Sequence, residues 1–143
     1  MWAREFEGRS TAVCDRLHAV LADVERWSEW NEGVAAAVVG RPFEAGADGV
    51  MTFPDGDQLR FRIVAVDPGR GFTDETPIPG TEMVVRVLHR LEPLDGLGTR
   101  IVYRCEVDGP GSDDLGPAIG DQVTADFPQV IAALARRAEE PAA

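Results

Sequence analysis

The chain has 143 residues, with 25 acidic residues against 14 basic ones and a formal net charge of −11 at pH 7. This length fits one domain, so we expect a single domain over residues 1–143. The negative charge argues against nucleic acid or a membrane surface as the main partner, because both require neutralising cations. All 14 basic residues are Arg, and the absence of Lys excludes Schiff-base chemistry and a P-loop.

The chain begins with one predicted strand followed by two predicted helices. Residues 2–10 alternate loosely between apolar and polar side chains, which indicates a strand. Apolar residues then recur with a period of about 3.6 over residues 12–22, which predicts an amphipathic helix. A short second helix over residues 23–31 carries Trp27 and Trp30, which share one helical face because they are three residues apart.

The middle of the chain reads as a meander of short strands separated by Gly, Pro and Asp. Asp55-Gly56 and the segment at 95–98 provide the tight turns of two hairpins. The predicted strands cover residues 34–40, 49–53, 58–66, 72–76, 83–91 and 99–107.

The last part of the chain is a long helical pattern. Apolar residues form a stripe from Leu115 to Leu134, which predicts a helix with one buried face. Pro128 lies inside this stripe and should kink or restart the helix, because its ring removes an amide and crowds the preceding turn. Strands followed by a closing helix predict an α+β fold.

Four short motifs resemble the START-like superfamily, also called Bet v 1-like or SRPBCC, which includes polyketide cyclase/dehydrase-like proteins. They are the tryptophan segment at 23–31, VDPGRGF at 66–72, LEP at 91–93 followed by GTRI at 98–101, and LG at 115–116. The resemblance covers essentially the whole chain. It implies a helix-grip fold, in which a curved antiparallel sheet of six to seven strands surrounds a long C-terminal helix. His18 occupies a position that is usually aromatic in the family, and its role stays open.

The resemblance also implies a ligand cavity between the sheet and the C-terminal helix. Strand alternation places residues 83, 85, 87, 89 and 91 inside, together with 59, 61 and 63 and with 101, 103, 105 and 107. We expect Trp30 at the wall or mouth of the cavity and Trp27 in a more peripheral position. The expected ligand-binding residues are Trp30, Phe61, Met83, Val85, Cys105 and Phe127.

His89 and Tyr103 are the candidate catalytic residues, because both are polar and both fall on the predicted inner face. Histidine titrates near neutral pH, and a phenol can donate a hydrogen bond to a carbonyl or enolate oxygen. The alternative is that His89 is a satisfied core residue and Tyr103 lies at the rim. Either Glu75 or Thr76 could face the same space, because the sequence does not determine which residues of the strand at 72–76 point inward.

Other kinds of site have no support in the sequence. The two histidines, His18 and His89, lack accompanying ligands at metal-binding spacing, so we expect no metal and no cofactor. Cys14 and Cys105 each lie in an apolar segment, which favours buried thiols over a disulfide. The N-terminal segment lacks a signal pattern and no long apolar stretch follows, so we expect a cytoplasmic protein without a membrane-spanning segment.

Three functions follow as hypotheses. The first is binding of a hydrophobic small molecule, such as a lipid, a polyketide or an aromatic metabolite, by a monomer or homodimer. The second is a polyketide aromatase/cyclase or dehydratase that needs no cofactor and uses His89 and Tyr103 for proton transfer. The third is a protein-interaction module like the branch of the superfamily that activates a chaperone ATPase.

Overall fold

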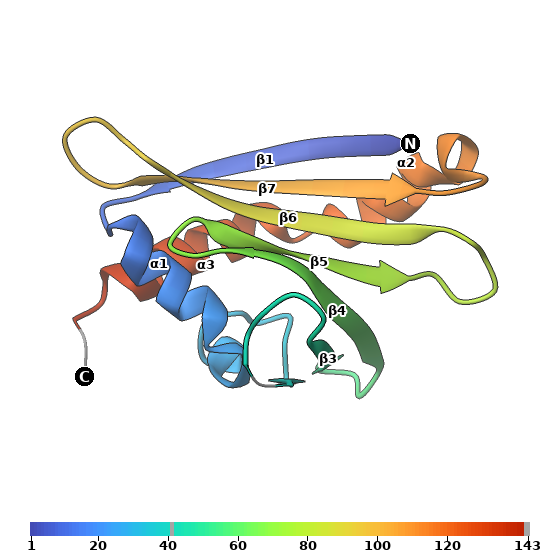
Figure 1. Cartoon of the computed structure of the whole chain (residues 1–143), viewed down its shortest axis with the longest axis horizontal. Helices are drawn as coiled ribbons and strands as arrows, with labels where there is room; N and C mark the ends of the chain where they lie inside the picture. Colours follow the sequence, from blue (N-terminus) through green and yellow to red (C-terminus); the bar gives the residue numbers. More distant parts are fainter. Residues whose placement is uncertain (41, 142–143) are drawn as a thin grey trace.

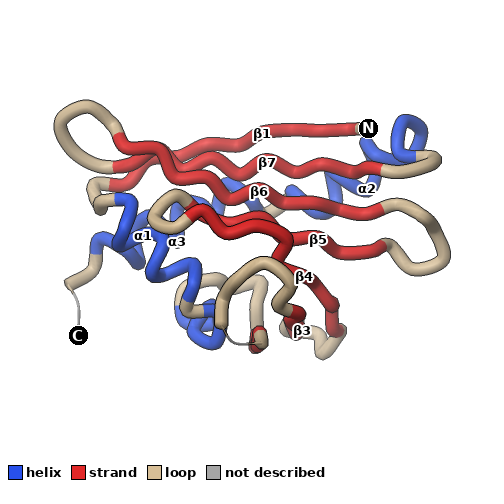
Figure 2. Tube along the Cα trace, viewed as in Figure 1, coloured by secondary structure: helices blue, strands red, loops and turns tan. Residues whose placement is uncertain are grey.

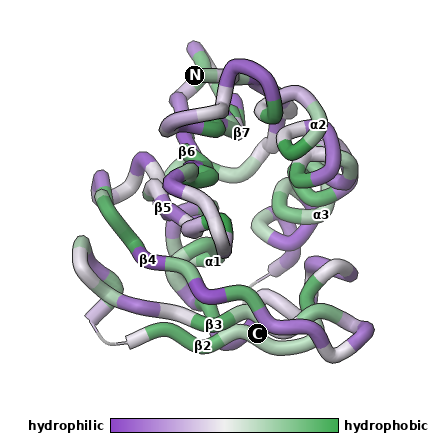
Figure 3. The backbone as a smooth tube through the Cα atoms, turned by 90° about the vertical axis from the view of Figure 1, so that its right-hand side faces the viewer, coloured by the Kyte–Doolittle hydropathy of each residue, from purple (hydrophilic) through white to green (hydrophobic). Residues whose placement is uncertain are grey.

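The computed structural model describes residues 1–40 and 42–141. The seven strands of the described residues join one antiparallel sheet in the order β1-β7-β6-β5-β4-β3-β2. Figures 1 and 2 label β1 and β3 to β7, and Figure 3 labels β2 beside β3. This arrangement confirms the predicted α+β helix-grip fold. The strands are β1 (Trp2–Ser10), β2 (Ala36–Val39), β3 (Asp48–Thr52), β4 (Gln58–Asp67), β5 (Gly71–Pro77), β6 (Val84–Pro93) and β7 (Thr99–Asp108).

Two short helices follow β1, as the sequence predicted. They are α1 (Cys14–Ala22) and the 3-10 helix η1 (Val24–Glu29). Trp30 directly follows η1, whereas Trp27 lies inside it. A 3-10 helix has three residues per turn, so both side chains still leave the same side of the chain.

The C-terminal helical region is divided in two. Helix α2 (Ser112–Thr124) is capped by Ala125, and α3 (Phe127–Glu139) begins two residues after this cap with Pro128 in its first turn. Proline is tolerated there because the first amides of a helix have no intrahelical acceptor. The predicted effect of Pro128 is therefore a restart of the helix rather than a smooth bend.

The sheet curves around one side of the molecule, and α2 and α3 lie on its concave side (Figure 3). The two helices pack mainly against β1 and β7. Gly116 and Gly120 of α2 lie directly against Trp2, where any added Cβ would overlap the indole ring. Gly8 of β1 meets Ile131 of α3 in the same way. Glycines therefore set the close approach of the helices to this edge of the sheet.

His18 ties α1 to the turn between β4 and β5. Its Nδ1 accepts a hydrogen bond from the Gly71 amide at 3.3 Å. Gly71 has a φ of +118°, and an added Cβ would overlap the His89 carbonyl, so only glycine fits at this turn. Burial lowers the pKa of His18, against the opposing charges of Asp15 and Asp67. The role of His18, which the sequence left open, is this structural contact.

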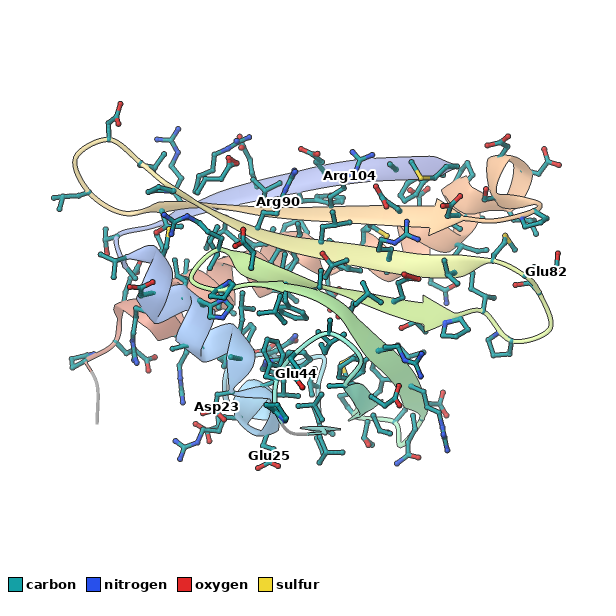
Figure 4. The ribbon with its side chains drawn as sticks, in the orientation of Figure 1. Asp23, Glu25, Glu44, Glu82, Arg90 and Arg104 are labelled. Atoms are coloured by element: carbon teal, nitrogen blue, oxygen red, sulfur yellow. The ribbon has the colours of Figure 1, made fainter. Side chains whose placement is uncertain are left out.

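The convex face of the sheet carries a network of ion pairs. Arg86 and Arg104 both contact Glu106 at 2.8 Å, while Arg90 and Arg104 contact Glu5 at 3.1 and 3.3 Å. Figure 4 labels two members, Arg90 and Arg104. These arginines alternate with the residues of β6 and β7 that were predicted to face inward, so they lie on the opposite face of the sheet.

Candidate functional site

The strand register places one row of rings across the concave face. Phe72 of β5 pairs with His89 of β6, His89 pairs with Tyr103 of β7, and Tyr103 pairs with Phe6 of β1. Directly paired residues of antiparallel strands project their side chains to the same face. The sequence-predicted pair His89 and Tyr103 is therefore brought together at the middle of the sheet.

These rings continue beyond the row and form one chain of contacts. Phe72 stacks on His89 with ring centroids 4.1 Å apart, and Tyr103 meets the His89 ring edge-on at 4.6 Å. Phe127 of α3 meets Tyr103 edge-on at 5.6 Å. At the other end, Trp27 stacks on Phe72 at 6.2 Å. The chain of rings thus links η1, the sheet and α3, and it fixes the orientation of His89.

His89 is anchored in one tautomer. Its Nδ1 lies 3.2 Å from the Phe72 carbonyl oxygen, which only accepts hydrogen bonds, so Nδ1 carries the proton and Nε2 is an acceptor. Burial lowers the pKa of His89 to about 4, and the hydrogen bond to Phe72 only partly opposes this effect. His89 is therefore a neutral hydrogen-bond acceptor at neutral pH.

The Tyr103 hydroxyl has no hydrogen-bond partner among the described residues, although the residue is only 3% exposed. The hydroxyl oxygen is not completely shielded from solvent. Burial raises the pKa of Tyr103 above its usual range, and the charges of Asp74 and Asp126 raise it further. Tyr103 is therefore a neutral phenol that is available to a ligand.

Asp74 is a third polar group on this face, and the sequence analysis missed it. It pairs with Ile63 of β4 and with Val87 of β6, and Val87 pairs with Cys105 of β7. This row lies beside the ring row, two residues further along each strand. Asp74 has no hydrogen-bond or ion-pair partner in the described part of the chain. Burial, followed by the charge of Glu75, raises its pKa from 3.8 to about 7.

The parity of β5, which the sequence left open, is now assigned. Phe72 is buried on the concave face, so Asp74 and Thr76 share that face by alternation. Thr76 accordingly pairs with the inward residue Val85. Glu75 points the other way and contacts Arg86 at 3.5 Å on the convex face. Of the two residues proposed from sequence, Thr76 faces inward and Glu75 does not.

The structure contradicts the position expected for Trp27, and it leaves the expected wall or mouth position of Trp30 a prediction. Trp27 is 8% exposed and lies against both Phe61 and Phe72, and its Nε1 donates to the Leu21 carbonyl at 2.9 Å. The expectation that Trp27 is peripheral is therefore wrong. Trp30 is only partly buried and packs against the core. Among the described residues, Trp30 Nε1 is the one side-chain polar atom that is both inaccessible to solvent and without a hydrogen-bond partner.

The remaining predicted ligand-binding residues all lie in the core. Phe61, Met83, Val85, Cys105 and Phe127 are each less than 9% exposed. Cys105 is a free thiol, as is Cys14, which confirms the prediction of buried thiols over a disulfide. Burial, followed by the charge of Asp74, raises the pKa of Cys105 to about 11, so its thiol is not a ready nucleophile.

Two surface pockets lie away from these residues. One of about 540 Å³ is bordered by residues 22–25 together with Val39, Pro42 and Phe43. One of about 420 Å³ is bordered by Met1 and residues 108–114. Neither is lined by a predicted site residue. Phe43, however, meets Phe72 edge-on at 5.2 Å, so the larger pocket adjoins the outer end of the ring chain.

The described residues contain no group of three His, Cys, Asp or Glu side chains placed to hold a metal ion. In the same part of the chain, no helix is long and apolar enough to cross a membrane.

Several solved structures share this fold. Ara h 8.0201 is 17% identical with a TM-score of 0.75, over 96% of this chain and 97% of its own. The Zhui aromatase/cyclase from a Streptomyces species is 17% identical with a TM-score of 0.74, over 96% and 93%. Norcoclaurine synthase from Thalictrum flavum is 14% identical with a TM-score of 0.73, over 98% and 87%. At these identities the likeness shows the fold alone.

A comparison with curated protein sequences finds no match. A family model described as polyketide cyclase / dehydrase and lipid transport matches residues 9–139, which is nearly the whole chain. The match includes η1, six of the seven strands in full and both C-terminal helices. The chain therefore belongs to the polyketide cyclase / dehydrase and lipid transport family.

Proposed function

We propose that this protein binds a hydrophobic small molecule, such as a lipid, a polyketide or an aromatic metabolite, between the concave face of the sheet and the C-terminal helices. The observation that carries the proposal is the set of inward polar groups Asp74, His89 and Tyr103. They lie among aromatic and aliphatic side chains, and within the described part of the chain neither the Asp74 carboxyl nor the Tyr103 hydroxyl has a hydrogen-bond partner. Ligand sites typically combine a largely apolar wall with a few such polar groups.

The exposure of the middle of the sheet supports the same proposal. Asp74, Val87 and His89 face inward, yet each is only partly buried. Helices α2 and α3 pack mainly on β1 and β7, so they leave the inward side chains of β5 and β6 less covered. A ligand that binds here would contact Val87 and the ring row directly.

The test uses two neighbouring residues of β6 that point to opposite faces. Val87→Phe adds volume on the concave face, whereas Leu88→Phe adds it on the convex face, where Leu88 pairs with Arg104. We expect Val87→Phe to weaken binding of the neutral dye N-phenylnaphthylamine about tenfold or more, and Leu88→Phe to change it less than about twofold. Native mass spectrometry of the protein purified from its own host would identify a retained ligand.

Equal effects of the two variants, or dye binding that neither variant changes, would refute a concave-face site. Absence of both dye binding and a retained ligand would leave the interaction module as the better hypothesis. Circular dichroism should show that both variants remain folded.

A cyclase or dehydratase is the second candidate function. It is favoured by the free Tyr103 hydroxyl beside the fixed His89 ring. Tyr103 would donate a hydrogen bond to a carbonyl or enolate oxygen, and His89 Nε2 would accept a proton from the adjacent carbon. A pKa of about 4 keeps His89 deprotonated but makes it a weak base.

His89→Gln separates the two functions. In an enzyme it should abolish turnover of a poly-β-ketone thioester while affinity stays within about tenfold, because proton transfer contributes roughly 10² to 10⁴ in rate. In a carrier the same substitution should alter affinity only. Unchanged turnover in His89→Gln would remove His89 from the mechanism.

A further inference from the structure

We propose that the ligand of the concave face carries an ammonium group, and that the Asp74 carboxylate is its counter-ion. This inference rests on the proposed binding function and names the class of ligand, a hydrophobic amine. The first observation is that no positively charged side chain of the described residues contacts the Asp74 carboxyl.

Among the described residues, the cross-strand neighbours of Asp74 offer no cation. Its partners across the sheet, Ile63 and Val87, are uncharged, and so is Cys105 beyond them. Arg4 of β1 pairs with Cys105, but its guanidinium contacts Asp121 of α2 at 3.6 Å. An unpaired carboxylate among apolar side chains is unfavourable, and a bound cation would remove that penalty.

The other titratable groups near Asp74 also disfavour an anionic ligand. From β5, Glu75 adds negative charge, although its own side chain is engaged with Arg86 on the convex face. Asp126, at the junction of α2 and α3, also contributes negative charge, which raises the pKa of Tyr103. From β6, His89 is neutral near pH 7. The local potential is therefore negative.

The polar atoms on this face match the donors of an ammonium group. His89 Nε2 is an acceptor because Nδ1 donates to the Phe72 carbonyl. The Tyr103 oxygen can also accept, and the Asp74 carboxylate accepts only. Asp74, His89 Nε2 and the Tyr103 oxygen thus offer three kinds of acceptor on one face of the sheet, and a primary ammonium has three N–H donors. The rings of Tyr103 and Phe127 add the electron-rich surfaces to which cations are attracted.

The pH dependence of binding distinguishes an amine from a neutral carbonyl ligand. Asp74 is ionised above its pKa of about 7 and protonated below it. An ammonium ion needs the carboxylate, so its affinity should rise as the pH increases through 7. A ketone would accept a hydrogen bond from the protonated carboxyl, so its affinity should fall over the same range.

The experiment compares three probes of similar shape, naphthylethylamine, naphthylethanol and naphthylacetone, by calorimetric titration of the full chain. At about pH 8.5, we expect the amine to bind about tenfold or more tightly than the alcohol, since a hydrogen bond to a charged group is worth that much. At about pH 5.5 this preference should largely disappear. Titrations in buffers of different ionisation enthalpy should show proton release when the amine binds near pH 7.

Asp74→Asn keeps the shape of the side chain and removes its charge, so it should abolish the preference for the amine and leave the alcohol unaffected. Glu75→Gln is the matched control, because it removes a carboxylate from the next residue on the opposite face. It should leave the preference at pH 8.5 unchanged. If Asp74→Asn does not fold, the pH trend of the unmodified protein decides the question alone.

The outcomes separate this inference from the proposed function. Equal affinity for amine and alcohol at pH 8.5, or a preference for the ketone that grows as the pH falls, would overturn the amine inference while the hydrophobic site stands. If Asp74→Asn and Glu75→Gln reduced the preference equally, general charge and not Asp74 would attract the amine, and the inference would fall. Failure of all three probes and of N-phenylnaphthylamine to bind would refute the proposed function itself.

Discussion

The two faces of the sheet differ in whether their charged side chains have partners of opposite charge. On the convex face, Arg86 and Arg104 share Glu106, and Arg90 and Arg104 share Glu5. On the concave face, Asp74 has no partner of opposite charge among residues 1–40 and 42–141. The convex charges are satisfied within the protein, whereas the concave carboxyl is not. The difference indicates that the concave face is completed by something other than this chain.

The magnitudes of the two kinds of interaction support this interpretation. Exposed ion pairs usually contribute about 0 to 1 kcal/mol each, while a buried polar group without a partner costs about 1 to 3 kcal/mol. The Asp74 carboxyl is partly buried and has no partner among the described residues, so it should lower the stability of the free protein by no more than an amount of this order. Substitutions on the two faces should differ accordingly in size, sign and dependence on pH.

The largest expected effect is the loss of a ring from the concave side. Trp27→Ala should lower the free energy of unfolding by about 3 to 5 kcal/mol, because Trp27 is buried against Phe61 and Phe72. Trp30→Ala is the matched control and should cost less, since Trp30 is only partly buried. Urea denaturation measures both values. A larger effect for Trp30 would contradict the packing described for η1.

The second prediction concerns Asp74. Its pKa in the folded state, about 7, is above the unfolded value of 3.8, so the folded state binds the extra proton and stability falls as the pH rises from about 4 to 7. Asp74→Asn cannot ionise, so it should abolish this decrease in the free energy of unfolding. Between pH 4 and pH 8 the variant should gain up to about 4 kcal/mol relative to the wild type. A stability difference independent of pH would show that the carboxyl is well solvated.

The third prediction has the opposite sign. The pKa of His89 in the folded state, about 4, is below the unfolded value of 6.5. The unfolded state therefore binds more protons between these values, and stability rises with pH over this range. His89→Gln should abolish that rise, which amounts to at most about 3 kcal/mol. Because Gln also loses the ring stacking, the slope against pH is the informative measurement, and an unchanged slope would argue against a buried neutral histidine.

The sequence predicted the fold and much of the concave face for identifiable reasons. In β6 and β7, charged residues alternate with apolar ones, so the positions of Arg86, Arg90 and Arg104 determine the inward side of both strands. The same alternation brought out His89 and Tyr103. Both strands pair along their whole length without a register shift, which is why a period of two was sufficient.

Asp74 was missed because β5 lacks such a pattern. The run from Thr73 to Thr76 is polar throughout, so only Phe72 indicates which side faces the core, and the register shift in the pairing of β4 with β5 obscures the neighbours. The relative burial of Trp27 and Trp30 also could not be predicted from the sequence, because a shared helical face does not determine which of the two rings the sheet covers. Both cases depend on contacts between distant segments.

The smallest expected effect belongs to the convex face. Arg90 and Glu5 are each nearly half exposed, so Arg90→Gln should change the free energy of unfolding by no more than about 1 kcal/mol, and added salt should reduce the difference because ions screen exposed pairs. The pH dependence between about 4 and 8 should match that of the wild type, since neither Asp74 nor His89 contacts this pair. Denaturation at low and high salt measures the effect. A loss of several kcal/mol, or an altered slope against pH, would mean that the two faces are coupled through the sheet and that the concave groups are not independent of the convex network.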